Sequence, residues 1–307
     1  MSRIYLNMTQ MIGNTPLMDL ERFTVNRGVS ARILAKIERQ NPSGSISDRT
    51  AFTIIKEAEY SRKLAPGGMI IEPASDGSGT SLAAVAAALG YRCVVVMPED
   101  ANRENALSPA AFGAEIVLTP PAEGKAGAEK MAEDLHCLIP GSIIIRCNGN
   151  EANPQTHYFS TGPEIWRECA GCLDIFVAGP GTEGMLEGAG RYLKEQNPSV
   201  KIIAAELKSE AQRTSIKTST RAATAKGAKS APPTAKKAIC EETLVVPDDC
   251  AIDTMKVLAQ TEGILCGKMS GAALYAAVLL AKRPEYKYKM IAVVLPDTGD
   301  RYLSFFG

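Results

Sequence analysis

The sequence predicts an α/β protein built from two three-layer α/β domains with mostly parallel sheets. One observation is the length, because 307 residues are enough for two domains with separate cores. Another is the apolar fraction of 45%, which is ordinary for a globular protein. The third is a nearly unbroken alternation of short β-branched runs with helical patterns, which is typical of parallel sheets covered by helices on both faces.

Eight runs of apolar and β-branched residues predict strands. In chain order they span 32–38, 69–73, 92–97, 114–118, 142–147, 173–178, 201–206 and 289–295. Between the runs, apolar residues recur at helical spacing, as Ala51, Ile54, Ile55 and Ala58 do. The same spacing predicts helices near 79–89, 102–112, 123–135, 160–169, 183–195, 250–262 and 270–282.

The overall charge and the hydropathy pattern exclude several classes of function. Basic and acidic residues both number 34, so the chain as a whole has no excess positive charge for binding nucleic acid or an acidic membrane. Residues 1–16 lack the apolar core of a secretory signal, and no apolar run is long enough to span a bilayer. We therefore expect a cytoplasmic protein that binds neither nucleic acid nor membrane.

Eight cysteines are scattered rather than spaced as a disulfide framework, which predicts free thiols in a cytosolic chain of this length. Cys169 and Cys172 form a CAGC pair, a pattern also found in redox sites and in half of a zinc site. No second pair follows, and the only histidines are His136 and His157. We therefore expect a surface turn with two thiols and no metal site.

Residues 208–238 interrupt the alternation. They hold eight Lys or Arg, one Glu and, apart from alanine, almost no apolar side chain except Ile216. Such a segment cannot bury enough surface to offset its ordering entropy, so we expect a mobile basic loop over 208–240. Two roles stay open for it, a solvated excursion and a docking arm for an acidic partner.

Three glycine-bearing turns follow predicted strands and precede predicted helices. We name them the opening loop (41–49, NPSGSISDR), the second turn (72–80, EPASDGSGT) and the third turn (178–184, AGPGTEG). Ligands in parallel α/β folds usually bind where such turns lead into helix N-termini. One glycine turn alone is a weak signal, but three of them predict a shared cleft.

Further motifs accompany these turns in a distinctive order. They are IGNTPL (12–17), NPQTHYFSTGPEIW (153–166), ILCGKMSGAA (264–273) and VVLPDTGDRYLS (293–304). With them, the chain resembles the cysteine synthase (O-acetylserine sulfhydrylase) and cystathionine beta-synthase family of fold-type-II pyridoxal-phosphate (PLP) enzymes. The resemblance implies a tryptophan synthase beta-like fold, with a smaller domain at 43–150 inserted into a larger one made of 1–42 and 151–307.

The departures from the family pattern concern its chemistry. In the family, the opening loop carries a lysine that binds the PLP aldehyde covalently and moves the substrate's α proton, and the resemblance places Ser47 there. A hydroxyl cannot form that bond and is a poor base near neutral pH. Two alternatives stay open: Ser47 as an engineered trapping substitution, and Lys268 as a relocated anchor.

The second turn is expected to bind the substrate. The resemblance assigns this role to Ser75, Asp76, Gly77, Ser78 and Cys147. Gly77 stands where the family has an asparagine on the ring oxygen of PLP, and Asp76 stands where it has a glycine against the substrate carboxylate. Two carboxylates about 4 Å apart repel by roughly 4 kcal/mol at an effective dielectric of 20, so substrate capture is expected to suffer.

The third turn resembles the family's phosphate cup. Its places are taken by Gly181, Thr182, Glu183, Gly184 and Met185. Met185 replaces a hydroxyl of the cup. An inward-pointing Glu183 would cancel much of the about 0.3–1 kcal/mol that a helix N-terminus contributes toward an anion, whereas an outward-pointing one would matter less. Thr298, at the place of the hydroxyl beside the pyridine nitrogen, is retained.

The motifs at Asn14–Pro16 and Thr161–Trp166 are retained, whereas the chemical positions are not. We therefore predict a pseudoenzyme that lacks covalent PLP, holds PLP at most weakly and noncovalently, and serves as a binding or regulatory subunit in sulfur metabolism. The alternative is residual or altered amino-acid transferase or lyase activity of the β-replacement type, with noncovalent PLP or none. The resemblance implies a homodimer, and the partners it suggests are serine acetyltransferase and an active cysteine synthase paralogue.

Overall fold

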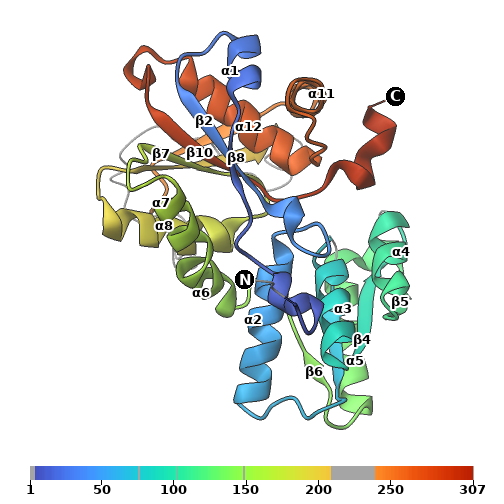
Figure 1. The fold of residues 1–307 in the computed structure, drawn as a ribbon. Helices are drawn as coiled ribbons and strands as arrows, with labels where there is room; N and C mark the ends of the chain where they lie inside the picture. The colour runs from blue at the N-terminus through green and yellow to red at the C-terminus, as the bar shows by residue number, and fades with distance from the viewer. Residues whose placement is uncertain (1–3, 75–76, 102, 148, 209–238, 307) are drawn as a thin grey trace, which may run out of the picture. The chain divides into compact units, whose positions relative to one another are not determined.

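The computed structural model describes residues 4–74, 77–101, 103–147, 149–208 and 239–306. The chain forms two compact units (Figure 1). Unit 1 comprises Met1–Pro16 and Glu38–Thr161, and unit 2 comprises Leu17–Ile37 and Gly162–Gly307. The domain division expected from the sequence assigns residues 1–16, 38–42 and 151–161 to the other part, and that division stays a prediction.

Unit 1 contains a four-stranded parallel sheet with the strand order β5-β4-β3-β6. The strands are β3 (Met69–Pro73), β4 (Arg92–Pro98), β5 (Glu115–Thr119) and β6 (Ile143–Ile144). The helices are α2 (Ser47–Tyr60), α3 (Ser78–Leu89), α4 (Arg103–Ala111), α5 (Gly124–Leu138) and α6 (Ala152–Phe159). Short 3-10 turns are η1 (Met8–Met11), η2 (Glu38–Gln40) and η3 (Pro121–Glu123).

Side-chain alternation along the strands decides which helix covers which face of this sheet. Ile70 of β3 packs in one core with α2 and α3, whereas Met69 and Ile71 pack in a second core with α5. On α2, the apolar residues at helical spacing, Ile54 and Ile55 among them, are buried. The periodicity in the sequence therefore marks the surface by which the helix packs.

Unit 2 contains a six-stranded sheet with the order β1-β2-β10-β7-β8-β9, in which only β1 is antiparallel to its neighbour. The strands are β1 (Leu17–Asp19), β2 (Arg32–Ile37), β7 (Ile175–Ala178), β8 (Lys201–Leu207), β9 (Glu242–Val246) and β10 (Met290–Leu295). The helices are α1 (Glu21–Arg27), α7 (Thr161–Glu168), α8 (Glu183–Gln196), α11 (Asp248–Glu262) and α12 (Lys268–Ala281), with 3-10 segments η4 (Pro284–Tyr286) and η5 (Gly299–Phe305).

The main core of unit 2 lies between its sheet and α1, α11 and α12. Ile33, Ala35 and Ile37 of β2 belong to this core. The alternating residues Leu34 and Lys36 therefore point to the opposite face. Helix α8 packs on β7 and β8, and its buried residues, such as Leu186, are not part of the α11 and α12 core.

The predicted mixed α/β class with mostly parallel sheets is confirmed, and every predicted strand is present. Strand β6 is shorter than the predicted 142–147, because only Ile143 and Ile144 pair with β3. The sequence analysis missed β1, β9, α1 and α6, which are short and carry little periodicity. Residues 209–238 of the predicted basic loop lie outside the described residues. No helix in the described part of the chain is long and apolar enough to cross a membrane.

Candidate functional site

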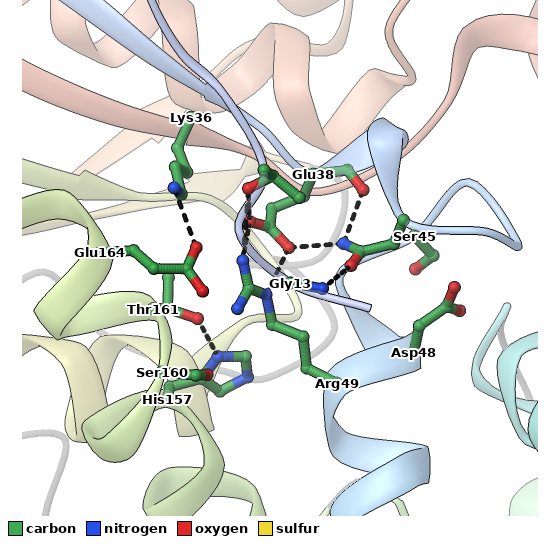
Figure 2. Close-up of polar contacts among 12 residues, drawn as sticks. Gly13, Lys36, Glu38, Ser45, Asp48, Arg49, His157, Ser160, Thr161 and Glu164 are labelled. Carbon is green, nitrogen blue, oxygen red and sulfur yellow. Dashed lines mark hydrogen bonds and ion pairs between the residues drawn. The ribbon is translucent and has the colours of Figure 1, made fainter. Parts of the chain in front are cut away.

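A buried ion pair holds the opening loop, as Figure 2 shows. Arg49 donates from Nε to Glu38 Oε2 at 2.8 Å and from Nη2 to Oε1 at 2.9 Å, so the guanidinium binds the carboxylate through two bonds. The two side chains are 2% and 0% exposed. A pair this deeply buried is favourable only when further hydrogen bonds satisfy its oxygens.

Two neutral side chains supply those hydrogen bonds. Thr15 Oγ1 donates to Glu38 Oε1 at 2.6 Å, and Asn41 Nδ2 donates to Oε2 at 2.7 Å. Asn41 Oδ1 in turn accepts from the Gly13 amide at 2.9 Å. We call Thr15, Glu38, Asn41 and Arg49 the buried frame. It fixes the IGNTPL motif against the opening loop, a role that the sequence analysis did not assign to Glu38 or Arg49.

Ser47 is the first residue of α2 and is half-buried. Its backbone amide donates to Ser45 Oγ at 3.2 Å. Its own hydroxyl has no hydrogen-bond partner among the described residues. A hydroxyl acts as a nucleophile only when a neighbouring base activates it, and no hydrogen bond joins the Ser47 hydroxyl to a base among the described residues.

Asp48 follows Ser47 and is fully buried. Its Oδ2 accepts from the Ser43 amide at 2.7 Å, and its Oδ1 accepts from the Ser43 hydroxyl. Ser43 Oγ also lies 3.0 Å from Ser81 Oγ on α3. Burial raises the pKa of the Asp48 carboxyl, and the hydrogen bonds from Ser43 and Ser81 oppose that rise. The Asp48 carboxyl therefore joins the start of α2 to Ser43, near the beginning of the opening loop.

The second turn is described in part, since Ser75 and Asp76 lie outside the described residues. Gly77 is the N-cap of α3 with φ −70 and ψ 0. Ser78 is buried and donates to Glu72 Oε1 at 3.3 Å, and the Cys147 amide donates to the same oxygen at 3.3 Å. The structure thus brings Ser78 and Cys147 together through Glu72. The signal for Glu72 was a carboxylate within the apolar run MIIEP.

The third turn is compact and uses its own hydroxyl internally. Gly181 has φ +69, a left-handed conformation that favours glycine. Thr182 is buried, and its Oγ1 donates to the Gly179 carbonyl at 2.6 Å. Glu183, the first residue of α8, is exposed, and whether its carboxylate faces a bound phosphate stays a prediction.

The remaining two places of the third turn differ in exposure. Gly184 is half-buried, whereas Met185 is 1% exposed. Met185 therefore packs in the interior with the other buried residues of α8. Its thioether offers a phosphate group no hydrogen-bond donor.

Thr298 is buried at the start of η5, within unit 2. Its Oγ1 donates to Asp300 Oδ2 at 2.7 Å and accepts from the Asp300 amide at 3.3 Å, so its single proton is already used. Its neighbour Asp297 was missed by the sequence analysis. Asp297 Oδ1 accepts from the Ser270 amide at 3.1 Å, Oδ2 has no partner among the described residues, and burial raises the pKa of this carboxyl.

Two lysines of unit 2 have their amines bound to carboxylates. Lys268, the first residue of α12, donates to Asp248 Oδ2 at 2.5 Å. Lys36 is fully buried, and its Nζ lies 2.9 Å from Glu164 Oε2 and 2.8 Å from Glu168 Oε2. The Lys268 amine is thus engaged by Asp248 within unit 2, and its role as a relocated anchor stays an open alternative.

The described parts of the opening loop and second turn belong to unit 1, and the third turn belongs to unit 2. The cleft that the three turns are expected to share therefore stays a prediction. Among the described residues, no group of three or more His, Cys, Asp or Glu is placed to hold a metal ion. His157 instead bonds through Nδ1 to Thr161 Oγ1 at 2.9 Å.

Comparison with known sequences gives long matches. The family model described as pyridoxal-phosphate dependent enzyme matches residues 8–297. The chain is 39% identical over 299 residues to a cysteine synthase of Staphylococcus aureus, covering 97% of this chain and 95% of the relative. It is 36% identical over 312 residues to the cystathionine beta-synthase of Apis mellifera, covering 99% of this chain and 62% of that protein.

Comparison with solved structures agrees. A cysteine synthase from Entamoeba histolytica matches with a TM-score of 0.85 and 34% identity, covering 99% of this chain and 90% of that one. An O-acetylserine dependent cystathionine beta-synthase from Helicobacter pylori matches with a TM-score of 0.85 and 31% identity, covering 99% and 98%. The resemblance seen in the sequence motifs is thereby confirmed.

Proposed function

Because the chain belongs to the pyridoxal-phosphate-dependent enzymes, we propose that it is a cysteine-synthase-like pseudoenzyme that binds a ligand or partner without β-replacement chemistry. The observation that carries the proposal is Ser47, which starts α2 beside an intact buried frame. Ser47, at the position expected to anchor the cofactor, lies in a regular helix and carries a hydroxyl instead of an amine.

The residues present do not fit covalently bound PLP. Its family normally binds this cofactor, whose aldehyde needs a primary amine for covalent attachment. Ser47 supplies a hydroxyl, and the amines of Lys36 and Lys268 are engaged by carboxylates.

Noncovalent PLP is expected to bind weakly. The third turn keeps a helix N-terminus, which favours an anion, but Glu183 places a carboxylate in the first turn of α8. Met185 adds no donor, and Thr182 already donates to Gly179. Glu183→Gln should tighten binding of PLP or inorganic phosphate about twofold to fivefold, in line with about 0.3–1 kcal/mol for one charge at a helix N-terminus.

The decisive experiment adds PLP to the purified chain, reduces with borohydride and maps any modified lysine. We expect no pyridoxyl-lysine in the natural chain or in Ser47→Ala. In Ser47→Lys we expect modification at position 47, because the frame that orients the start of α2 is retained. A pyridoxyl group mapped to Lys268 or any other lysine of the natural chain would overturn the proposal.

The alternative is residual transferase or lyase activity, and one observation favours it. Thr298, at the place of the hydroxyl beside the pyridine ring, is retained and buried. An assay of O-acetylserine with sulfide separates the two functions. We expect no cysteine above the level given by heat-denatured protein, and turnover that follows protein concentration would establish the alternative.

The proposed pseudoenzyme binds a partner protein of sulfur amino-acid metabolism. The curated and solved relatives include cysteine synthases, so the ligands to test are a C-terminal peptide of serine acetyltransferase and an active cysteine synthase. Asp76 adds a negative charge where a peptide carboxylate is expected to dock. Asp76→Gly should therefore strengthen binding of the peptide about tenfold, measured by calorimetry. An unchanged affinity for the peptide would exclude serine acetyltransferase as a partner at this site.

A further inference from the structure

The CAGC segment forms a tight turn between α7 and β7. The Cys172 amide donates to the Cys169 carbonyl at 3.0 Å, which closes a four-residue turn. Ala170 has φ +49 and Gly171 has φ +73, and positive φ at both central residues is typical of a type I′ turn. Alanine rarely adopts this conformation, and the amides of Ala170 and Gly171 donate to the Arg167 and Trp166 carbonyls of α7, each at 3.1 Å.

The turn brings the two cysteines within bridging distance. The first and fourth Cα atoms of a β-turn lie within about 7 Å of each other, and disulfides usually span about 4.4–6.8 Å between Cα atoms. Both thiols are free. A disulfide between them therefore requires side-chain rotation rather than a large movement of the backbone.

The two thiols differ in access. Cys172 is exposed, whereas Cys169 is 4% exposed. Burial and the neighbouring Glu168 raise the pKa of Cys169 to about 11, against a smaller lowering by Arg32 and Lys36. An external reagent therefore meets Cys172 first, and Cys169 can act only as the second, internal thiol.

We propose that Cys169 and Cys172 form a thiol–disulfide exchange site for small disulfides of the glutathione class. The Cys172 thiolate attacks one sulfur of the small disulfide, the sulfur–sulfur bond breaks, and one small thiol leaves. Cys169 then loses its proton and attacks Cys172 Sγ, which releases the second small thiol. The two protein thiols lose two electrons and two protons, and the small disulfide gains them as two thiols.

A natural reporter lies beside this turn. A side-chain carbon at Gly171 would lie 3.3 Å from Cζ2 of Trp166, so the turn packs against the indole. Trp166 is the only tryptophan in the chain. Formation of a disulfide next to it should change its fluorescence with the same rate as the loss of the two thiols.

The test treats the full chain with glutathione disulfide and reduced glutathione, then digests it with trypsin. Residues 168–191 form one tryptic peptide that contains Cys169 and Cys172 and no other cysteine. We expect this peptide to lose two hydrogens and carry no glutathione. Cys137, which is also exposed and has no neighbouring cysteine in the sequence, should retain bound glutathione and serves as the internal control.

Two variants separate the roles of the thiols. Cys169→Ser should leave glutathione trapped on Cys172, because the internal thiol is missing. Cys172→Ser should leave Cys169 unmodified in the folded chain. Both variants retain the single tryptophan, so near-ultraviolet circular dichroism checks their folding, and the natural chain in urea gives a reference that does not depend on either variant.

The equilibrium constant for forming the Cys169–Cys172 disulfide should be about tenfold larger in the folded chain than in the urea-unfolded reference, because the turn is already closed in the folded chain. Equal or weaker formation in the folded chain would overturn the proposal. A stable glutathione adduct on Cys172 of the natural chain, without release of the second thiol, would also overturn it.

Discussion

The opening loop and the third turn both lead into a helix N-terminus, yet they are held in different ways. In the opening loop, the buried frame places one carboxylate, that of Glu38, at the centre of hydrogen bonds from three side chains. In the third turn, the Thr182 hydroxyl donates to the Gly179 carbonyl, and no buried ion pair of this kind is seen among the described residues of that turn. We therefore expect that damage to the opening loop costs far more folding free energy than damage to the third turn.

The proposed absence of an anchoring lysine at position 47 is compatible with an intact opening loop. Ser47 contributes a backbone amide to Ser45 and makes none of the hydrogen bonds of the buried frame. The residue at this position is therefore constrained by chemistry rather than by packing. Under the proposed loss of cofactor chemistry, the residue at position 47 can change, whereas loss of Arg49, two positions later, would leave Glu38 buried without its charge partner.

The largest expected effect comes from Arg49→Ala, which leaves the Glu38 carboxylate buried without its charge partner. Removal of one member of a buried pair typically costs about 3–5 kcal/mol of unfolding free energy. Urea-induced unfolding followed by circular dichroism measures it.

The matched control is Lys56→Ala in the same helix. Lys56 pairs with Glu59, but its side chain is 49% exposed, so its loss should cost at most about 1 kcal/mol. If Arg49→Ala cost no more than Lys56→Ala, the buried frame would not be what holds the opening loop.

The next effect is a pH dependence that originates in unit 2. Burial raises the pKa of the Asp297 carboxyl above its ordinary value of 3.8. At pH values between 3.8 and the raised pKa, the folded chain therefore binds more protons than the unfolded chain. The contribution of Asp297 to stability therefore falls as the pH rises through this window. Asp297→Asn mimics the protonated form and should remove that fall.

The measurement is the unfolding free energy of the natural chain and of Asp297→Asn from about pH 4 upward. The natural chain should lose stability relative to the variant as the pH rises, and the difference should then level off. A difference that stays constant across the whole range would show that Asp297 does not hold a proton in the folded state.

Much of the fold could be predicted from the sequence, because buried parallel strands carry continuous apolar runs. Strands such as β3 and β4 are therefore visible by composition alone. Strand β1 has three residues and α6 has eight, which is too short for a period to emerge.

The candidate site could be predicted only where family motifs locate a position, whether the residue is retained, as Thr298 is, or changed. Ser47 and Glu183 could be named from motifs, because a changed residue inside a fixed pattern is visible. Glu38, Glu72 and Asp297 could not, since each is a carboxylate in or next to an apolar strand and has at least one partner in another element. Only the folded structure shows that their oxygens are buried and which donors they meet.

A smaller effect is expected in the third turn. Thr182→Val keeps the shape of a buried side chain and removes the bond to the Gly179 carbonyl, which should cost about 1 kcal/mol. Thr261→Val is the control, because Thr261 bonds to the Val257 carbonyl inside a regular helix and is less buried, so its cost should be about 0.5 kcal/mol or less. A loss above 3 kcal/mol for Thr182→Val would place the third turn on a par with the buried frame.

The smallest effect is expected at the anchor position itself. Ser47→Ala removes a hydroxyl that has no hydrogen-bond partner among the described residues, so the unfolding free energy should change by no more than about 0.5 kcal/mol. Ser43→Ala, four residues earlier, removes the hydroxyl that donates to buried Asp48 and should cost about 1–3 kcal/mol. The two serines share one loop, and the Ser43 hydroxyl contacts both Asp48 and Ser81. A large loss of unfolding free energy in Ser47→Ala would therefore mean that Ser47 is kept for the fold, against the proposed loss of cofactor chemistry.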